Sequence, residues 1–113
     1  MPVYKFKSDE INKQVKNHKI GNYNLGELNK GGEFIPRYTG RSDLDLKEEL
    51  KKRLSTHSHH EYFRFWYKAS VKDAFEHECR KYHQFLKQLE NKTHPQKPPG
   101  KNYECPIKGC DNS

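Results

Sequence analysis

Two predicted helices each carry a charged residue on the face that should be apolar. Arg53 lies three residues after Leu50, and His57 lies four residues after Arg53, so both share the face of the leucines. In the later helix Glu78 follows Phe75 by three residues and interrupts its apolar stripe in the same way. Each helix is therefore expected to aim a charged group at the sheet that it covers.

A guanidinium and a carboxylate in these positions allow two interpretations. The structural one is an Arg53–Glu78 salt bridge, or an Arg53 whose stem lies on the core while its guanidinium stays in water. The functional one is a phosphodiester site. There Glu78 would hold Mg²⁺, a hard ion that prefers oxygen ligands, and Arg53 would stabilise charge developing on the phosphate.

The net charge favours a polyanionic partner. The 113-residue chain has 22 Lys and Arg against 15 Asp and Glu, a formal charge of +7 at pH 7. Basic side chains near phosphates release condensed counterions, so DNA is the first partner to consider, and a basic chain that is simply soluble is the alternative. No segment resembles a signal peptide or a membrane span, and three cysteines cannot all pair. We therefore expect a cytoplasmic protein without a membrane partner.

The first half of the chain predicts a helix followed by a hairpin. A helix is expected over residues 8–18, with Ser8 as its N-cap and with Ile11 and Val15 on its apolar face. Residues 20–28 and 33–40 flank a turn-rich segment and predict two paired strands. Pro36 in the second of them suits an edge strand or a bulge.

The rest of the chain predicts two longer helices around an aromatic strand. The helices are expected over residues 44–57 and 70–90, and the strand over residues 62–68. The expected fold is α/β, a small central three-stranded antiparallel sheet flanked by helices. It forms a single domain over residues 1–95, and a basic arm containing Pro, Gly and Cys follows over residues 96–113.

Two tripeptides add to this pattern, GNY at residues 21–23 and YTG at residues 38–40. Together with Arg53 and Glu78 they resemble the GIY-YIG nuclease superfamily. In that family the paired motifs lie on two strands of a small antiparallel sheet. An Arg on the next helix, a Glu on a later helix and a downstream Asn, here Asn91, complete the site. The resemblance covers residues 21–95 and has the same order of elements as the periodicities predict.

The resemblance assigns the strand residues to a phosphate pocket. Tyr23 and Tyr38 would line it, one of them orienting or deprotonating the attacking water. Gly40 would let backbone and phosphate approach closely, and Arg41 would add a phosphate contact.

The resemblance also assigns roles to four later residues. Arg53 would steady the scissile phosphate, and His57 would hydrogen-bond a tyrosine hydroxyl or a phosphate oxygen. Glu78 would hold the single Mg²⁺, and Asn91 would help to shape the site. The implied activity is Mg²⁺-dependent hydrolysis of DNA phosphodiester bonds.

Two departures from the family pattern define the alternative function. Asn22 replaces the usual apolar middle residue of the first motif, and the fourteen residues 24–37 separate the tripeptides. A catalytically inactive nucleic-acid-binding module on the same scaffold is the alternative. A protein-interaction domain using the aromatic strand is a third interpretation.

Two groups of cysteine and histidine residues have spacings that could form metal sites. Cys105 and Cys110 have four residues between them, a spacing that can supply half of a zinc site but that needs His94 or a second subunit to complete it. The pattern favours a thiol-containing tail or a local disulfide over zinc. The histidines at 57, 59 and 60 indicate a polar helix exit, and Cys79 indicates a small core residue.

Overall fold

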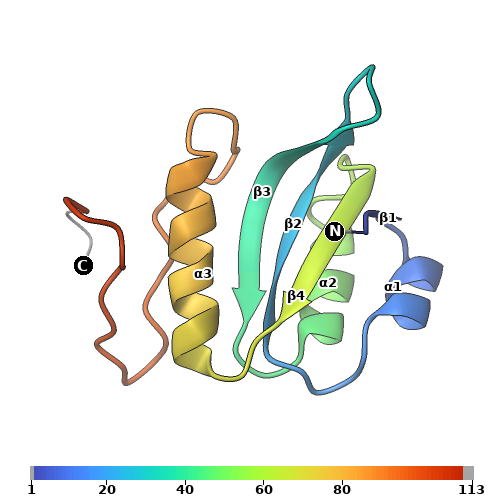
Figure 1. Cartoon of the computed structure of the whole chain (residues 1–113). Coiled ribbons are helices and arrows are strands. Elements are labelled where there is room, and N and C mark those ends of the chain that lie inside the picture. The colour runs from blue at the N-terminus through green and yellow to red at the C-terminus, as the bar shows by residue number, and fades with distance from the viewer. Residues whose placement is uncertain (1, 111–113) are drawn as a thin grey trace.

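A computed structural model describes residues 2–110 as a four-stranded antiparallel sheet with three helices (Figure 1). The sheet order is β1-β4-β2-β3, so β3 is an edge strand. No helix within residues 2–110 is long and apolar enough to cross a membrane. In chain order the elements are β1 (Tyr4–Lys5), α1 (Ser8–Gln14), β2 (Gly21–Leu28), β3 (Phe34–Ser42), α2 (Leu46–Leu54), β4 (Tyr62–Tyr67) and α3 (Val71–Gln84).

The expectation of three strands is wrong, because β1 extends the sheet beyond β4. Tyr4 pairs with Phe63 and Lys5 with Tyr62. The ring of Tyr4 lies 5.7 Å from that of Phe63, and Phe6 is buried against the same ring. Burial of these aromatic rings holds the short segment on the sheet edge, and two residues are too few to show a strand periodicity.

The central strand β2 is buried on both faces because helices cover both. Tyr23 and Leu25 point to the main core, which α1 and α2 complete. Asn22 and Asn24 point to the opposite face, where Nδ2 of Asn22 donates to the carbonyl of Ala74 on α3 at 2.8 Å. The asparagine that departs from the motif pattern is therefore a sheet-to-helix contact.

The β2–β3 hairpin contains the bulge that Pro36 was expected to favour. Leu25 pairs with Tyr38 and Gly26 with Pro36, so Arg37 is the extra residue on β3. A proline is tolerated here because the edge strand has no further strand to receive its missing N–H. The segment after α3 covers this edge instead, with the Glu90 N–H donating to the Arg37 carbonyl at 2.7 Å.

The helices agree with the predicted ones in position and are shorter. Ser8 is the first helical residue of α1 and not its N-cap, which is Lys7. In α2 the stripe of Leu46 and Leu50 is buried as expected, and the helix ends at Leu54 instead of reaching residue 57. In α3 Ser70 caps the helix, which ends at Gln84 because the chain then turns toward the β3 edge.

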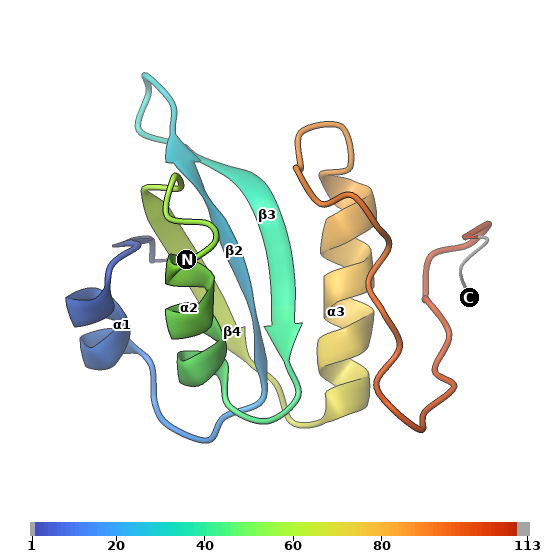
Figure 2. The same ribbon diagram turned by 180° about the vertical axis from the view of Figure 1, so that it is seen from behind.

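The basic arm packs against α3 (Figure 2). Residues 91–110 contain neither helix nor strand. Cys105 is buried against Phe75 and Cys79 of α3, and Tyr103 and Ile107 pack on the same cluster. Cys79 is fully buried, as expected of a core residue. The arm thus forms a small second core on the outer side of α3.

Candidate active site

A pocket of about 390 Å³, the β3-edge pocket, lies at the outer edge of β3. Because β3 is an edge strand, residues from both of its faces reach the same opening: Tyr38 and Gly40 from the α2 side, and Arg41 from the α3 side. Seven of the eight predicted site residues line this pocket: Tyr23, Tyr38, Gly40, Arg41, Arg53, Glu78 and Asn91.

Tyr23, Glu49 and Arg53 form one connected group in the pocket. The Tyr23 hydroxyl donates to Oε2 of Glu49 at 2.9 Å, and Nε of Arg53 donates to the same oxygen at 2.9 Å. Burial, assisted by the negative charge of Glu49, holds the pKa of Tyr23 well above its ordinary value. Tyr23 is therefore a protonated phenol at neutral pH, and Glu49 accepts the hydrogen bond from its hydroxyl.

Tyr38 packs beside Tyr23 and shares its protonation state. The two ring centroids are 6.2 Å apart with nearly parallel planes. Burial raises the pKa of Tyr38 as well. Its hydroxyl is thus available at neutral pH as a hydrogen-bond donor toward an anion.

Arg41 and Glu78 face each other on the opposite side of the pocket. Nη1 of Arg41 donates to Oε1 of Glu78 at 2.5 Å, and Nε donates to Oδ1 of Asp43 at 2.9 Å. The Arg53–Glu78 salt bridge considered from the sequence is wrong, since Arg53 pairs with Glu49. Burial alone would lower the pKa of Arg41, but Glu78 and Asp43 together raise it.

Glu78 is the carboxylate best suited to respond to pH. Burial raises its pKa to about 7, although Arg41 acts in the opposite direction. The side chain of Glu78 is only 10% exposed, so desolvation of the carboxylate outweighs the attraction of Arg41. Glu78 therefore changes charge close to neutral pH.

The pocket carries an excess of negative charge once Glu78 is ionised. Three carboxylates, those of Asp43, Glu49 and Glu78, line it together with two guanidiniums. When all five groups are ionised, the excess is one negative charge. A phosphate would thus be repelled on balance, whereas a divalent cation would be attracted.

Gly40 is required by Tyr23 and not by open space for a phosphate. The two residues are cross-strand partners in β2 and β3. A Cβ atom on Gly40 would overlap the phenol ring and hydroxyl of Tyr23. The glycine therefore lets Tyr23 lie across β3 and bring its hydroxyl to the pocket.

Asn91 fixes the wall of the pocket to β3. Its Oδ1 accepts from the Thr39 N–H at 3.0 Å, and its Nδ2 donates to the Thr39 carbonyl at 2.9 Å. The side chain therefore replaces a strand neighbour on the exposed edge. Asn91 is thus placed to position the segment that follows it, where Thr93 to Gln96 also line the pocket.

His57 is the predicted site residue that does not line the pocket. Its ring packs on the outer side of Tyr38, with centroids 4.4 Å apart, and it borders a neighbouring hollow. Burial lowers the pKa of His57, so the imidazole is neutral at pH 7. His57 therefore contacts the site only indirectly, by packing against the ring of Tyr38.

Two acidic residues in the pocket were missed from the sequence. Glu49 was not among the predicted site residues, yet it lies four residues before Arg53 and pairs with it. Asp43, which lies between β3 and α2, was not predicted as a site residue either. The i,i+4 spacing of Glu49 and Arg53 was the available signal.

Comparisons of this chain with protein-family models, with curated proteins and with solved structures give no match.

Proposed function

We propose that this chain is a Mg²⁺-dependent endonuclease that hydrolyses DNA phosphodiester bonds on a GIY-YIG-like fold. The proposal rests on one observation: two phenols and a guanidinium from one side of the sheet converge with Glu78 from the other side at a single opening. The net charge of +7 supports a polyanionic substrate.

The donor groups suit a hard divalent cation. Glu78 offers a carboxylate in a pocket with excess negative charge, and Mg²⁺ is commonly held by one or two carboxylates together with water and substrate phosphate. When bound, the ion would act as a Lewis acid that neutralises charge on the phosphate and the leaving oxygen. Glu78 would hold it, and Arg41 must then release Oε1.

The tyrosine and Glu49 would handle the proton of the attacking water. The Tyr23 hydroxyl oxygen takes a proton from water while its own proton passes to Oε2 of Glu49. The water oxygen forms the new bond to phosphorus while the bond to the leaving oxygen breaks, and the leaving oxygen departs with that electron pair and takes a proton from solvent. Tyr38, also protonated, donates a hydrogen bond to the phosphate.

Arg53 would stabilise the charge that develops on the phosphate. Its Nε is committed to Glu49, which orients the guanidinium, and the other N–H groups serve the phosphate. Asn91 acts as a positioning residue through Thr39, and His57 acts through Tyr38.

The direct test is nicking of supercoiled DNA by the purified chain. We expect cleavage with Mg²⁺, none with chelator, and none for Glu78→Gln. Glu76→Gln, on the same helix but outside the pocket, is the matched control and should cleave like wild type. Equal cleavage by wild type and Glu78→Gln would refute the assignment.

A nucleic-acid-binding module without turnover is the second candidate. The Arg41–Glu78 contact favours it, because the guanidinium occupies the oxygen that a metal would need. Such a module would bind DNA with strong salt dependence, and it would not cleave DNA whichever divalent metal is added. Cleavage that Arg53→Ala abolishes and Lys52→Ala preserves would exclude this candidate, since both changes remove one positive charge from α2.

A further inference from the structure

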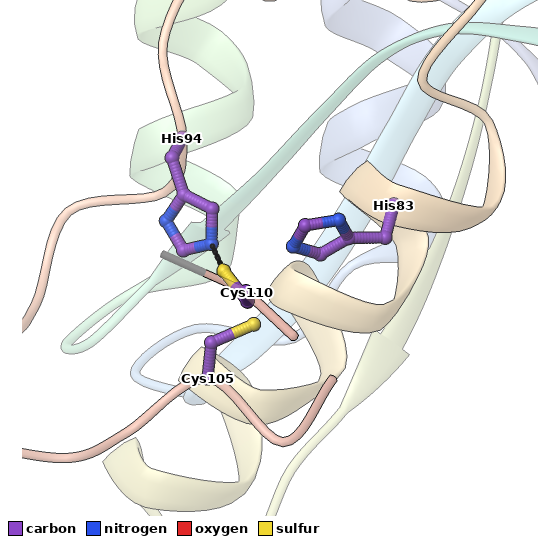
Figure 3. A group of neighbouring side chains, drawn as sticks. All are labelled: His83, His94, Cys105 and Cys110. Carbon is purple, nitrogen blue, oxygen red and sulfur yellow. Dashed lines mark hydrogen bonds between the residues drawn. The ribbon is translucent and has the colours of Figure 1, made fainter. Parts of the chain in front are cut away.

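Four side chains from α3 and from the segment that follows it meet beside α3 (Figure 3). They are His83 on α3, His94 after it, and Cys105 and Cys110 in the arm. Each offers one ligand atom, and these atoms all lie within 4.8 Å of one another. The two histidines supply the second pair of ligands that the Cys105–Cys110 spacing lacked.

We infer that His83, His94, Cys105 and Cys110 form a structural zinc site that fastens the C-terminal arm to α3. Two imidazole nitrogens and two thiolates are a ligand set that zinc accepts in tetrahedral geometry. A site with four protein ligands has no open position for a reacting water. Its role would be structural, and it would adjoin the β3-edge pocket, because His94 also lines that pocket.

The distances are close to those of a metal-bound set. Nε2 of His94 and Sγ of Cys110 are 3.3 Å apart. Zinc–nitrogen bonds of about 2.0 Å and zinc–sulfur bonds of about 2.3 Å place tetrahedral ligand atoms roughly 3.3–3.8 Å from each other. Small side-chain rotations would bring the remaining atoms into this range.

The histidines are oriented as zinc ligands. Nδ1 of His94 lies 2.9 Å from the Pro95 carbonyl, so it carries the proton and leaves the lone pair of Nε2 for a metal. Nε2 of His83 is buried without a hydrogen-bond partner in residues 2–110, and the ring points toward the cysteines (Figure 3). A buried acceptor without a partner is costly, and a metal bond would satisfy it.

The sulfur and nitrogen donors distinguish this site from that expected for Mg²⁺. Thiolate is a soft ligand that selects zinc over hard ions, and no carboxylate belongs to the group. Binding one Zn²⁺ would release two protons, one from each thiol, while both imidazoles bind in their neutral form. No oxidant or reductant is required.

Zinc would also fix one wall of the β3-edge pocket. His94 precedes Pro95 and Gln96, which line that pocket, and the Gln96 carbonyl accepts from Arg41 at 2.6 Å. The zinc inference does not depend on the proposed nuclease function. A chain that binds zinc without cleaving DNA would retain it.

Metal content of the untagged full chain, purified under reducing conditions, tests the inference. We expect about one zinc per chain. After chelator treatment, titration with Co²⁺ should give the visible bands of tetrahedral cobalt with thiolate charge transfer, and Zn²⁺ should displace them. Thiol labelling should show Cys105 and Cys110 protected by zinc and released by chelator.

Variants identify the ligands. Cys105→Ser, Cys110→Ser and His94→Ala should each weaken cobalt binding at least about tenfold. Cys79→Ala keeps all four ligands and should bind cobalt like wild type. The wild-type spectrum and thiol protection decide the question even if a variant fails to fold. A reduced wild-type chain with no zinc and no tetrahedral cobalt spectrum would overturn the inference, as would equal loss in Cys79→Ala.

Discussion

Arg41 on β3 and Glu78 on α3 form a buried ion pair, with Nη1 donating to Oε1 at 2.5 Å. The two side chains are only 11% and 10% exposed. The pair joins the edge strand to the helix and occupies the carboxylate that would hold a metal. Its charge state therefore controls both the local stability and the availability of Glu78.

Arg41→Gln should destabilise the fold more at high pH than at low pH. The pKa of Glu78 is about 7 in the folded chain against an ordinary value of 4.5, so the folded chain holds a proton that the unfolded chain loses. The free energy of unfolding contributed by Glu78 therefore falls as the pH rises through this window. Without Arg41 the loss should reach roughly 3 kcal/mol at about pH 8 and be smaller at about pH 5.5.

Urea unfolding at both pH values measures this difference. Arg37→Gln, which breaks the exposed pair with Glu27, is the matched control and should change stability by less than about 1 kcal/mol at either pH. An Arg41→Gln effect that does not vary with pH would contradict the assignment of the titration to Glu78.

Gly40→Ala should destabilise the chain by about 1–3 kcal/mol, because the new methyl group overlaps the Tyr23 ring. Thermal or urea unfolding measures the loss. Gly31→Ala in the hairpin loop, where a Cβ meets only ordinary contacts, should stay within about 0.5 kcal/mol of wild type. Similar losses of stability for the two substitutions would contradict the prediction, because they would show that the Tyr23 ring moves aside at little energetic cost.

The periodicity of apolar residues predicted most of the fold because the side chains that repeat at helical or strand spacing are the ones that are buried. Leu46 and Leu50 in α2, and Phe75 and Cys79 in α3, recur at helical spacing and are all fully buried. Strand β1 was not predicted because a strand of two residues is too short to show the alternation of apolar and polar side chains. It depends on burial of aromatic rings against β4, which is a tertiary effect.

The site was predicted as a set of residues but not as a set of pairs. Spacing along a helix indicated that Arg53 and Glu78 face the sheet, yet it cannot say which partner each one meets. Arg41 reaches Glu78 because β3 is an edge strand whose two faces share one opening. His83 was not identified at all, because it becomes a neighbour of Cys105 only when the arm folds back on α3.

Nicking of DNA should accelerate as the pH rises through about 7, because Glu78 must lose its proton before it can hold Mg²⁺. Rates measured at constant ionic strength and a fixed, subsaturating Mg²⁺ concentration, at which the proton competes with the metal for Glu78, give the profile. We expect a tenfold slower rate for each pH unit below the pKa, as for a single ionisation. A flat profile between about pH 5.5 and about pH 8 would argue against Glu78 as the metal ligand.

Tyr23→Phe should separate catalysis from folding. The change removes the hydroxyl that donates to Glu49 at 2.9 Å, which should cost about 1 kcal/mol of stability. If Tyr23 handles the proton of the attacking water, nicking should fall about 100-fold or more. Tyr62→Phe on β4, outside the β3-edge pocket, should cleave like wild type. Unchanged cleavage by Tyr23→Phe would remove the phenol from the proposed proton path.

Asn91→Ala should loosen the wall of the pocket without disturbing the core. The substitution removes two hydrogen bonds to the Thr39 backbone, worth about 1–3 kcal/mol together. Amide hydrogen exchange offers a local readout, because the Thr39 N–H donates to Asn91 and should exchange faster in the variant. The Leu50 amide, within the buried stripe of α2, serves as the internal reference. If Thr39 and Leu50 accelerate equally, the effect is global, and Asn91 does not act as a clamp on the β3 edge.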